Sequence, residues 1–249
     1  MIITKTELDL LADKYETVEF IKNDPIQFPH KGLSNKDKEL FGFIASLFAY
    51  GNRKLFIKFL ENLFSVMDYK PYEFIANPNY QKLKGMYYRF QNENDITELI
   101  KVLNKLYTTS NGIKELFEYH YSNEKSIPIM LKRVTDYFRI NTSTDAGRGY
   151  YQLFPNPQKN GAMKRLNMFL RWMIRKPPVD LGIWDFIPQS ELLIPLDVHV
   201  ARLSREMGLL KTKNNDMKSV IELTENLKTY SPDDPVKYDF AIFGLGINN

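Results

Sequence analysis

The chain has 249 residues, of which 43% are hydrophobic, and its formal net charge is +4. This length suits one large domain or two closely packed lobes around an ordinary globular core. Cysteine is absent, which excludes disulfides, thiolate zinc sites and iron–sulfur clusters. No apolar run reaches the ~18 residues of a membrane span, and acidic residues interrupt the start before a signal-peptide core forms. We expect a cytoplasmic monomer without membrane contact, metal or cofactor.

Apolar residues recur at helical spacing along most of the chain, and no strand-like alternation persists. The predicted helices cover residues 39–64, 94–121, 126–140, 162–175, 216–230 and 234–247. Gly51 is expected to divide the first of these ranges, and residues 110–112 the second. Asn94 or Asp95 is the expected cap of the helix that follows it. The sequence therefore predicts an all-α fold.

Two segments lack helical periodicity. Residues 143–161 are rich in Gly, Pro, Asn and Ser, and residues 175–197 contain four prolines. Turn chemistry predicts irregular structure for both. They flank the predicted helix 162–175 on both sides, and long irregular connections in helical proteins often carry function. We therefore look for a site beside this helix.

A basic row runs along that helix. Lys164, Asn167, Arg171 and Arg175 follow at steps of three and four residues and so share one face. No acidic residue lies between Lys159 and Lys176 to pair with them. Such a row is typical of a solvated helix face, but it also suits contact with a polyanion. Charge alone leaves both interpretations open.

Two residues at predicted helix starts are candidates for chemistry. Lys164 follows the turn at Gly161, and a cation in a first turn opposes the helix dipole unless something compensates it. Asp197 stands at the next helix start, after Pro195. It is either an N-cap or a carboxylate that faces a cleft. A helix start and burial would both lower the pKa of a catalytic lysine.

These motifs resemble those of a known superfamily. The Gly-containing turn, the early Lys and the later P-L-D-V-H-V-A-R are similar to helix-hairpin-helix DNA glycosylases with a GPD motif. More closely, the chain resembles a bacterial family of unknown function, the DUF2400 type. The segments that carry this likeness are DPIQFPHKG, YYRFQNENDI, KRLNMFLRWMIR, DLGIW, IPLDVHVARL and DPVKYDFAIFGLG. The archaeal GO glycosylases look like the nearest characterised relatives, although FPNPQKNGAMKR replaces the usual L-P-G-[IV]-G hairpin.

The resemblance implies a fold and an activity. It implies two helical lobes around a cleft, residues 1–65 with 205–249 and residues 66–204. It implies a nucleoid-associated base-excision repair enzyme acting on DNA, with a damaged base in a duplex as the expected partner. The implied activity is that of a DNA glycosylase and AP lyase for an oxidised purine, 8-oxoguanine first. Lys164 would be the Schiff-base nucleophile and Asp197 its carboxylate partner.

The resemblance also assigns further residues. Asp239 and Phe243 would bond and stack on the base, and Tyr50 would line the same pocket. The alternative is that Phe243 belongs to the core and that Asp239 is a surface residue balancing Lys237. The implied contacts to DNA phosphates are Lys159, Gly161, Arg165 and Arg171. His199 is expected to support the loop at Asp197.

Two other classes of function remain open. A non-catalytic nucleic-acid-binding module that retains the fold would not form a covalent adduct with DNA. A helical interaction protein without a nucleic-acid role would show no DNA affinity at ~100 mM salt, where real phosphate contacts give salt-dependent binding.

Overall fold

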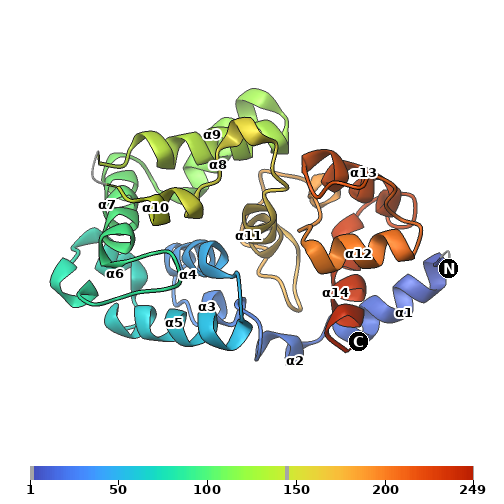
Figure 1. Ribbon diagram of the computed structural model, residues 1–249, viewed down its shortest axis with the longest axis horizontal. Helices are drawn as coiled ribbons and strands as arrows, with labels where there is room; N and C mark the ends of the chain where they lie inside the picture. The colour runs from blue at the N-terminus through green and yellow to red at the C-terminus, as the bar shows by residue number, and fades with distance from the viewer. Residues whose placement is uncertain (1–2, 144–145, 249) are drawn as a thin grey trace. The chain divides into compact units, whose positions relative to one another are not determined.

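A computed structural model describes residues 3–143 and 146–248 (Figure 1). These residues form helices and turns without strands, apart from isolated bridges at Tyr88–Gln91 and Gly161–Asp216. The predicted all-α class is therefore confirmed. The chain divides into two compact units, residues 25–159 and residues 1–24 with 160–249. These boundaries differ from the expected lobes, because residues 25–65 pack with the helices that follow them and residues 160–204 with the carboxy-terminal ones.

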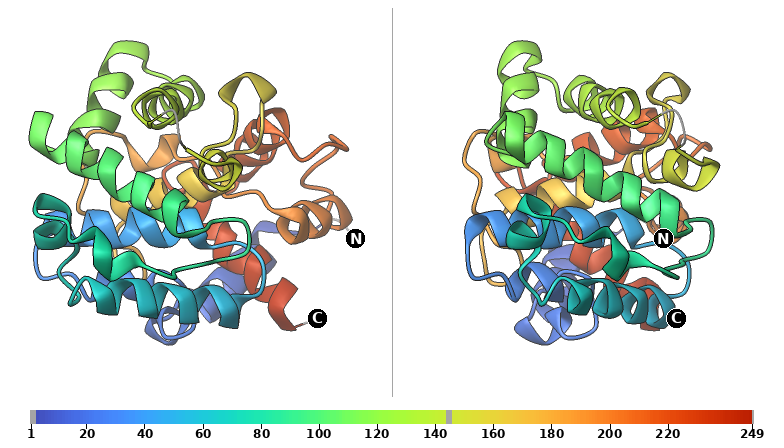
Figure 2. Two further views of the ribbon diagram at one scale, coloured as in Figure 1. Left: turned by 60° about the vertical axis from the view of Figure 1, so that its left-hand side comes forward. Right: turned by 90° about the vertical axis from the view of Figure 1, so that its left-hand side faces the viewer.

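The unit of residues 25–159 is built around one buried helix. Its helices are α3 (Gln27–His30), α4 (Asn35–Phe48), α5 (Arg53–Val66), α6 (Pro71–Ala76), α7 (Glu93–Thr109), α8 (Ile113–Glu124), α9 (Ile127–Ile140) and α10 (Arg148–Leu153), with 3-10 turns η1 (Tyr80–Leu83) and η2 (Pro157–Lys159). Every residue of α4 from Glu39 to Phe48 is buried. This helix contacts α3, α5, α6 and α8 (Figure 2). A helix that is apolar on most sides is expected at the centre of a unit.

The second unit joins both ends of the chain. It contains α1 (Lys5–Tyr15), α2 (Val18–Ile21), α11 (Lys164–Ile174), α12 (Val198–Glu206), α13 (Met217–Lys228) and α14 (Tyr238–Asn248), with 3-10 turns η3 (Gln189–Glu191) and η4 (Pro235–Lys237). Helix α14 packs on α1 and on α12. At Gly244 a Cβ would lie 2.2 Å from the Tyr15 ring, so the approach of α14 to α1 requires glycine there.

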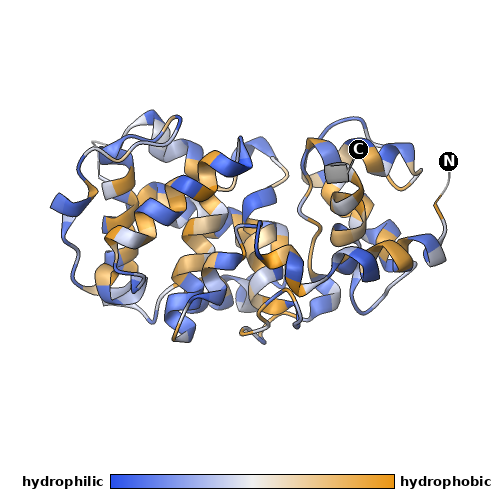
Figure 3. Ribbon diagram, turned by 90° about the horizontal axis from the view of Figure 1, so that it is seen from below, coloured by the Kyte–Doolittle hydropathy of each residue, from blue (hydrophilic) through white to orange (hydrophobic). Residues whose placement is uncertain are grey.

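Hydropathy explains which helix faces are buried. Figure 3 shows many helices with an orange, apolar side beside a blue, polar one.

Most predicted helices are present with ends shifted by a few residues, and Gly51, at φ +82, separates α4 from α5. Asn92, and neither Asn94 nor Asp95, caps α7, although Asp95 completes the capping box. The prediction of irregular structure over 143–161 is wrong in part, because α10 lies within that range.

Candidate functional site

Helix α11 starts abruptly at Lys164. The preceding Met163 adopts a left-handed conformation with φ +50 and gives the helix no side-chain cap. Asn160 is also left-handed, and its carbonyl accepts a hydrogen bond from Met217 N–H at 3.0 Å. Lys164 is therefore the first helical residue, where its charge opposes the helix dipole as expected.

Asp197 compensates that charge from the start of α12. Its Oδ2 lies 3.1 Å from Lys164 Nζ. Its Oδ1 accepts hydrogen bonds from the backbone N–H groups of His199 and Val200, at 2.9 and 2.8 Å. The two interpretations of Asp197, as an N-cap and as a partner of the lysine, both hold because each uses a different oxygen.

The ion pair is only partly covered. The side chain of Lys164 is 31% exposed and that of Asp197 is 17% exposed, so a ligand has access to the pair. Burial raises the pKa of Asp197, but the Lys164 ammonium and the Val200 N–H lower it more, and the net shift is downward. Asp197 is therefore ionised at neutral pH.

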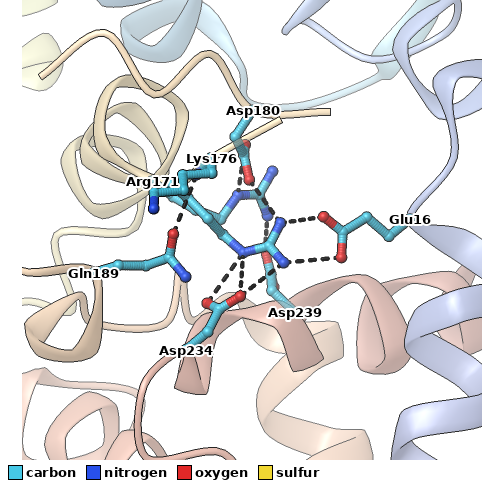
Figure 4. A network of polar contacts seen from close by, with 8 residues as sticks. Glu16, Arg171, Lys176, Asp180, Gln189, Asp234 and Asp239 are labelled. Carbon is cyan, nitrogen blue, oxygen red and sulfur yellow. Dashed lines mark hydrogen bonds and ion pairs between the residues drawn. The ribbon is translucent and has the colours of Figure 1, made fainter. Parts of the chain in front are cut away.

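The two arginines of the basic row, Arg171 and Arg175, are buried in a cluster of ion pairs. Arg171 Nε lies 3.2 Å from Asp180 Oδ1, and its NH1 pairs with Asp239. Arg175 pairs with Glu16, with Asp180 at 3.2 Å and with Asp234 at 2.8 Å. Figure 4 shows these carboxylates arranged around the guanidinium groups. We call these six residues the arginine cluster.

Burial of the arginine cluster corrects the interpretation of the helix face. Arg171 is 4% exposed and Arg175 is 6% exposed. Both guanidinium groups pair with carboxylates, and Phe240 packs against them, its ring centre 4.5 Å from Arg171 Cζ. The row beyond Lys164 is neither a solvated face nor a polyanion contact. The expected contact between Arg171 and a DNA phosphate needs an accessible guanidinium, and Arg171, which is 4% exposed, does not offer one.

The Lys164–Asp197 pair acts electrostatically on Asp239 of the arginine cluster. Burial is the main reason why the pKa of Asp239 is raised to about 6, against the lowering effect of Arg171. The charge of Asp197 contributes to this rise, and the charge of Lys164 opposes it. The cluster and the pair together hold three cations (Lys164, Arg171, Arg175) and five carboxylates (Glu16, Asp180, Asp197, Asp234, Asp239). Lys164 therefore lies in a locally acidic environment.

The proline-rich loop after α11 holds Asp180 in the arginine cluster. Leu181 N–H donates to the Trp172 carbonyl and Trp184 N–H to the Met173 carbonyl, both at 2.8 Å. These bonds satisfy carbonyls at the carboxyl end of α11. Trp184 is buried edge-on against Phe169, with ring centres 5.2 Å apart. The loop is irregular as predicted, yet it is fixed to the helix on both sides of Asp180.

The base-pocket roles of Asp239, Phe243 and Tyr50 stay predictions. Asp239 is buried and Lys237 pairs with Asp9 at 2.7 Å, so the alternative of a surface pair between residues 237 and 239 is wrong. Phe243 is half-buried, with its ring centre 6.0 Å from that of Phe20. Tyr50 belongs to the unit of residues 25–159, where its hydroxyl donates to Gln91.

Four residues keep their sequence-based roles as predictions. Lys159 and His199 are exposed, and Arg165 is half-buried. At Gly161 an added Cβ would meet nothing within 4 Å, so the backbone there is open on that side. Asp180, Glu16 and Asp234 were not among the predicted site residues. Asp180 was detectable as the first acidic residue after a helix without any, but Glu16 and Asp234 are far away in the chain.

Comparison with protein-family models shows to which family the chain belongs. A family model described as "Protein of unknown function (DUF2400)" matches residues 24–248. The chain belongs to this family. The match includes Lys164, Asp197 and most of the arginine cluster, but not Glu16. Neither the search of curated proteins nor that of solved structures gave a match.

Neither a membrane-spanning helix nor a group of metal-binding side chains is found among the described residues. Among residues 3–143 and 146–248, no helix is long and apolar enough to cross a membrane. Over the same residues, His, Asp and Glu side chains form no group of three or more that could hold a metal ion.

Proposed function

We propose that this DUF2400 chain is a DNA glycosylase with AP-lyase activity that excises an oxidised purine, with 8-oxoguanine as the first candidate. The observation that carries the proposal is the partly exposed Lys164–Asp197 pair, in which an amine lies 3.1 Å from a carboxylate at a second helix start. The motif resemblance to helix-hairpin-helix glycosylases supports it. The contacts proposed for phosphates are Lys159, Gly161 and Arg165, without Arg171.

The pair has the parts that a Schiff-base mechanism needs. Transfer of a proton from Nζ to Asp197 Oδ2 gives a neutral amine, which attacks C1′ while the bond to the base breaks. The base leaves with the proton that Asp197 accepted, which restores the carboxylate. Ring opening then moves a proton from Nζ to the sugar oxygen O4′ and gives a protonated Schiff base between Lys164 and C1′. Loss of a C2′ proton expels the 3′ phosphate, and water releases the enzyme. The restored Asp197 carboxylate stabilises the positive charge at C1′.

The substrate must bring a nucleotide out of the helix. A glycosylase reaches C1′ only after the damaged nucleotide leaves the base stack, which is easiest for a base whose pairing is already weakened. The arginine cluster is buried, so binding energy for this step has to come from other residues.

A second candidate is a nucleic-acid-binding module without catalysis. It is favoured by the ion pair itself, since a structural link between α11 and α12 would have the same geometry. It predicts DNA affinity without any covalent intermediate.

Borohydride trapping separates the two candidates. Wild type and Lys164→Gln would be incubated with oligonucleotides containing 8-oxoguanine, uracil or an abasic site, with borohydride to reduce the Schiff base. We expect a trapped adduct and strand cleavage with wild type, and neither with Lys164→Gln. Lys176→Gln is the matched control, because Lys176 is an exposed lysine just beyond α11.

Asp197→Asn tests the partner separately from the fold. Its amide oxygen still accepts the bonds from His199 and Val200, so α12 remains capped while the negative charge is lost. We expect cleavage to fall by at least about a hundredfold, in the range typical for loss of acid–base catalysis. No adduct with wild type on any substrate would contradict the glycosylase proposal and leave the binding module.

A further inference from the structure

A tight turn in the unit of residues 25–159 has an unusual residue at its first central position. Tyr88 and Gln91 exchange two backbone hydrogen bonds of 2.9 Å, so Arg89 and Phe90 form a two-residue hairpin loop. Arg89 has φ +53. A positive φ at this position normally selects glycine, because a Cβ is strained there. The strained residue is an arginine and not a glycine, which indicates that its side chain has a role that glycine could not fill.

Buried hydrogen bonds and close packing hold the base of the turn in place. Gln91 is fully buried; its Nε2 donates to the Gly149 carbonyl at 2.8 Å, and its Oε1 accepts from the Tyr50 hydroxyl. The Tyr88 hydroxyl donates to the Tyr50 carbonyl. A Cβ at Gly149 would lie 2.1 Å from the Phe90 carbonyl oxygen, so α10 lies directly against the turn. The ends of α4, α7 and α10 thus hold the turn in place.

This rigid base carries exposed aromatic and cationic side chains. Tyr87 is 66% exposed and Phe90 is 54% exposed. Arg89 is exposed, and its guanidinium lies 5.8 Å from the Tyr50 ring centre and 5.6 Å from that of Phe90. Arg148, next to Gly149, is exposed as well. In the part of the chain that the structure describes, neither arginine forms an ion pair.

We propose that Tyr87, Arg89, Phe90 and Arg148 form a stacking platform for unpaired nucleotides of a nucleic-acid strand. Exposed aromatic rings stack on nucleobases of any sequence, and arginines without carboxylate partners are available to phosphates. The platform suits single strands because base faces inside a duplex are covered by their neighbours. The inference rests on the proposed function only in taking nucleic acid as the partner.

Fluorescence anisotropy with a labelled oligothymidylate of about twelve nucleotides tests the platform, since single-strand sites commonly span ~4–16 nucleotides. We expect Phe90→Ala to weaken binding about tenfold, as for loss of one stacked base. Arg148→Gln should make the slope of log affinity against log salt less steep by about 0.7, the value for one phosphate contact on a single strand. A duplex of the same length should bind wild type less tightly.

Matched controls separate these effects from general ones. Tyr119→Ala removes another exposed aromatic ring, 63% exposed on α8, and Lys105→Gln removes another exposed cation, on α7. Neither should change binding. Arg89→Gly removes the guanidinium but favours the turn, so weaker binding by this variant could not be attributed to a misfolded turn.

The outcomes distinguish the platform from the glycosylase proposal. Weakened binding by the turn variants establishes the platform, even if wild type gives no borohydride adduct. Turn variants and controls that bind equally well, or a wild type without affinity for single strands at low salt, would overturn it. In both of those cases an adduct at Lys164 would leave the glycosylase proposal standing.

Discussion

The arginine cluster and the network below the Tyr88–Gln91 turn are both buried polar networks, but they differ in the kind of bond they use. The arginine cluster consists of ion pairs between two guanidinium groups and four carboxylates. The network below the Tyr88–Gln91 turn consists of neutral hydroxyl, amide and carbonyl groups from Tyr50, Tyr88, Gln91 and Gly149. The arginine cluster belongs to the same unit as the partly exposed amine of Lys164, and the neutral network supports an exposed turn.

The difference affects how each network responds to change. Buried ion pairs repay a large desolvation cost, so the loss of one partner leaves an uncompensated charge in the interior. Neutral hydrogen bonds contribute less and are insensitive to pH near neutrality. We therefore expect the arginine cluster to make the unit of residues 1–24 and 160–249 sensitive to single substitutions and to pH, and the turn network to depend chiefly on close packing.

The largest expected effect is that of Asp180→Asn. Asp180 is fully buried and contacts both Arg171 and Arg175. Its loss should lower the free energy of unfolding by about 3–5 kcal/mol, as for breaking a buried ion pair. Urea unfolding measures this. The control Glu206→Gln removes a partner of Arg202 in a pair more than half exposed, and should cost less than about 1 kcal/mol. Equal effects would remove the distinction between buried and exposed pairs.

The next effect is a pH dependence specific to the arginine cluster. The pKa of Asp239 in the folded chain, about 6, lies above its ordinary value of 3.8, so the folded chain holds this proton more tightly than the unfolded chain. Its contribution to stability is therefore complete below pH 3.8 and is lost as the pH rises through about 6. The loss is on the order of 2–3 kcal/mol.

Asp239→Asn isolates that contribution. Urea unfolding from pH 4 to 7 should show a smaller loss of stability with rising pH in the variant than in wild type. Carboxylates with lowered pKa values, such as Asp197, change stability in the opposite sense and in both proteins alike. Parallel pH profiles would mean that Asp239 is ionised throughout this range.

Packing, and not charge, should dominate in the turn network. Gly149→Ala places a Cβ 2.1 Å from the Phe90 carbonyl oxygen and 2.3 Å from Asp95 Oδ2. We expect a loss of about 1–3 kcal/mol that is the same from pH 5 to 8. Gly161→Ala is the control, because nothing lies within 4 Å of its added Cβ, and it should change stability by less than about 0.5 kcal/mol. Thermal and urea unfolding of both variants would measure the difference.

The smallest expected effect is that of Arg89→Gly on stability. Relief of the left-handed strain, worth about 1–2 kcal/mol, is offset by the greater freedom of glycine in the unfolded chain and by the lost contact with Tyr50. The net change in unfolding free energy should be within about 0.5 kcal/mol. A large destabilisation would show that the arginine serves the fold, and would remove the strain argument for the stacking platform.

Local signals in the sequence predicted much of the fold. Helical periodicity gave α4, α5, α7, α8, α9 and α11, and Gly51 marked a real break because its positive φ ends the run. The placement of Lys164 and Asp197 at two helix starts was also correct, since capping and proline chemistry act over a few residues. Their distance of 3.1 Å depends on tertiary packing and was expected only from the family resemblance.

The sequence did not predict which distant acidic residues pair with the arginines of the basic row. The helix that carries Lys164, Arg171 and Arg175 has no acidic residue between Lys159 and Lys176, which made an exposed basic face a reasonable prediction. The structure supplies Glu16 and Asp234 from segments far away in sequence. Helix periodicity identifies residues that share a face, but not which distant segment covers that face. The roles of Asp239, Phe243 and Tyr50 in a base pocket stay predictions for the same reason.

The carboxylate of Asp197 has two inequivalent oxygens. Oδ1 is held by the amides of His199 and Val200, so the group cannot turn over without opening the first turn of α12. Any proton that the carboxylate accepts therefore goes to Oδ2, on the side of Lys164. A helix cap in this way acts as a stereochemical restraint: the backbone determines from which direction a proton arrives and departs.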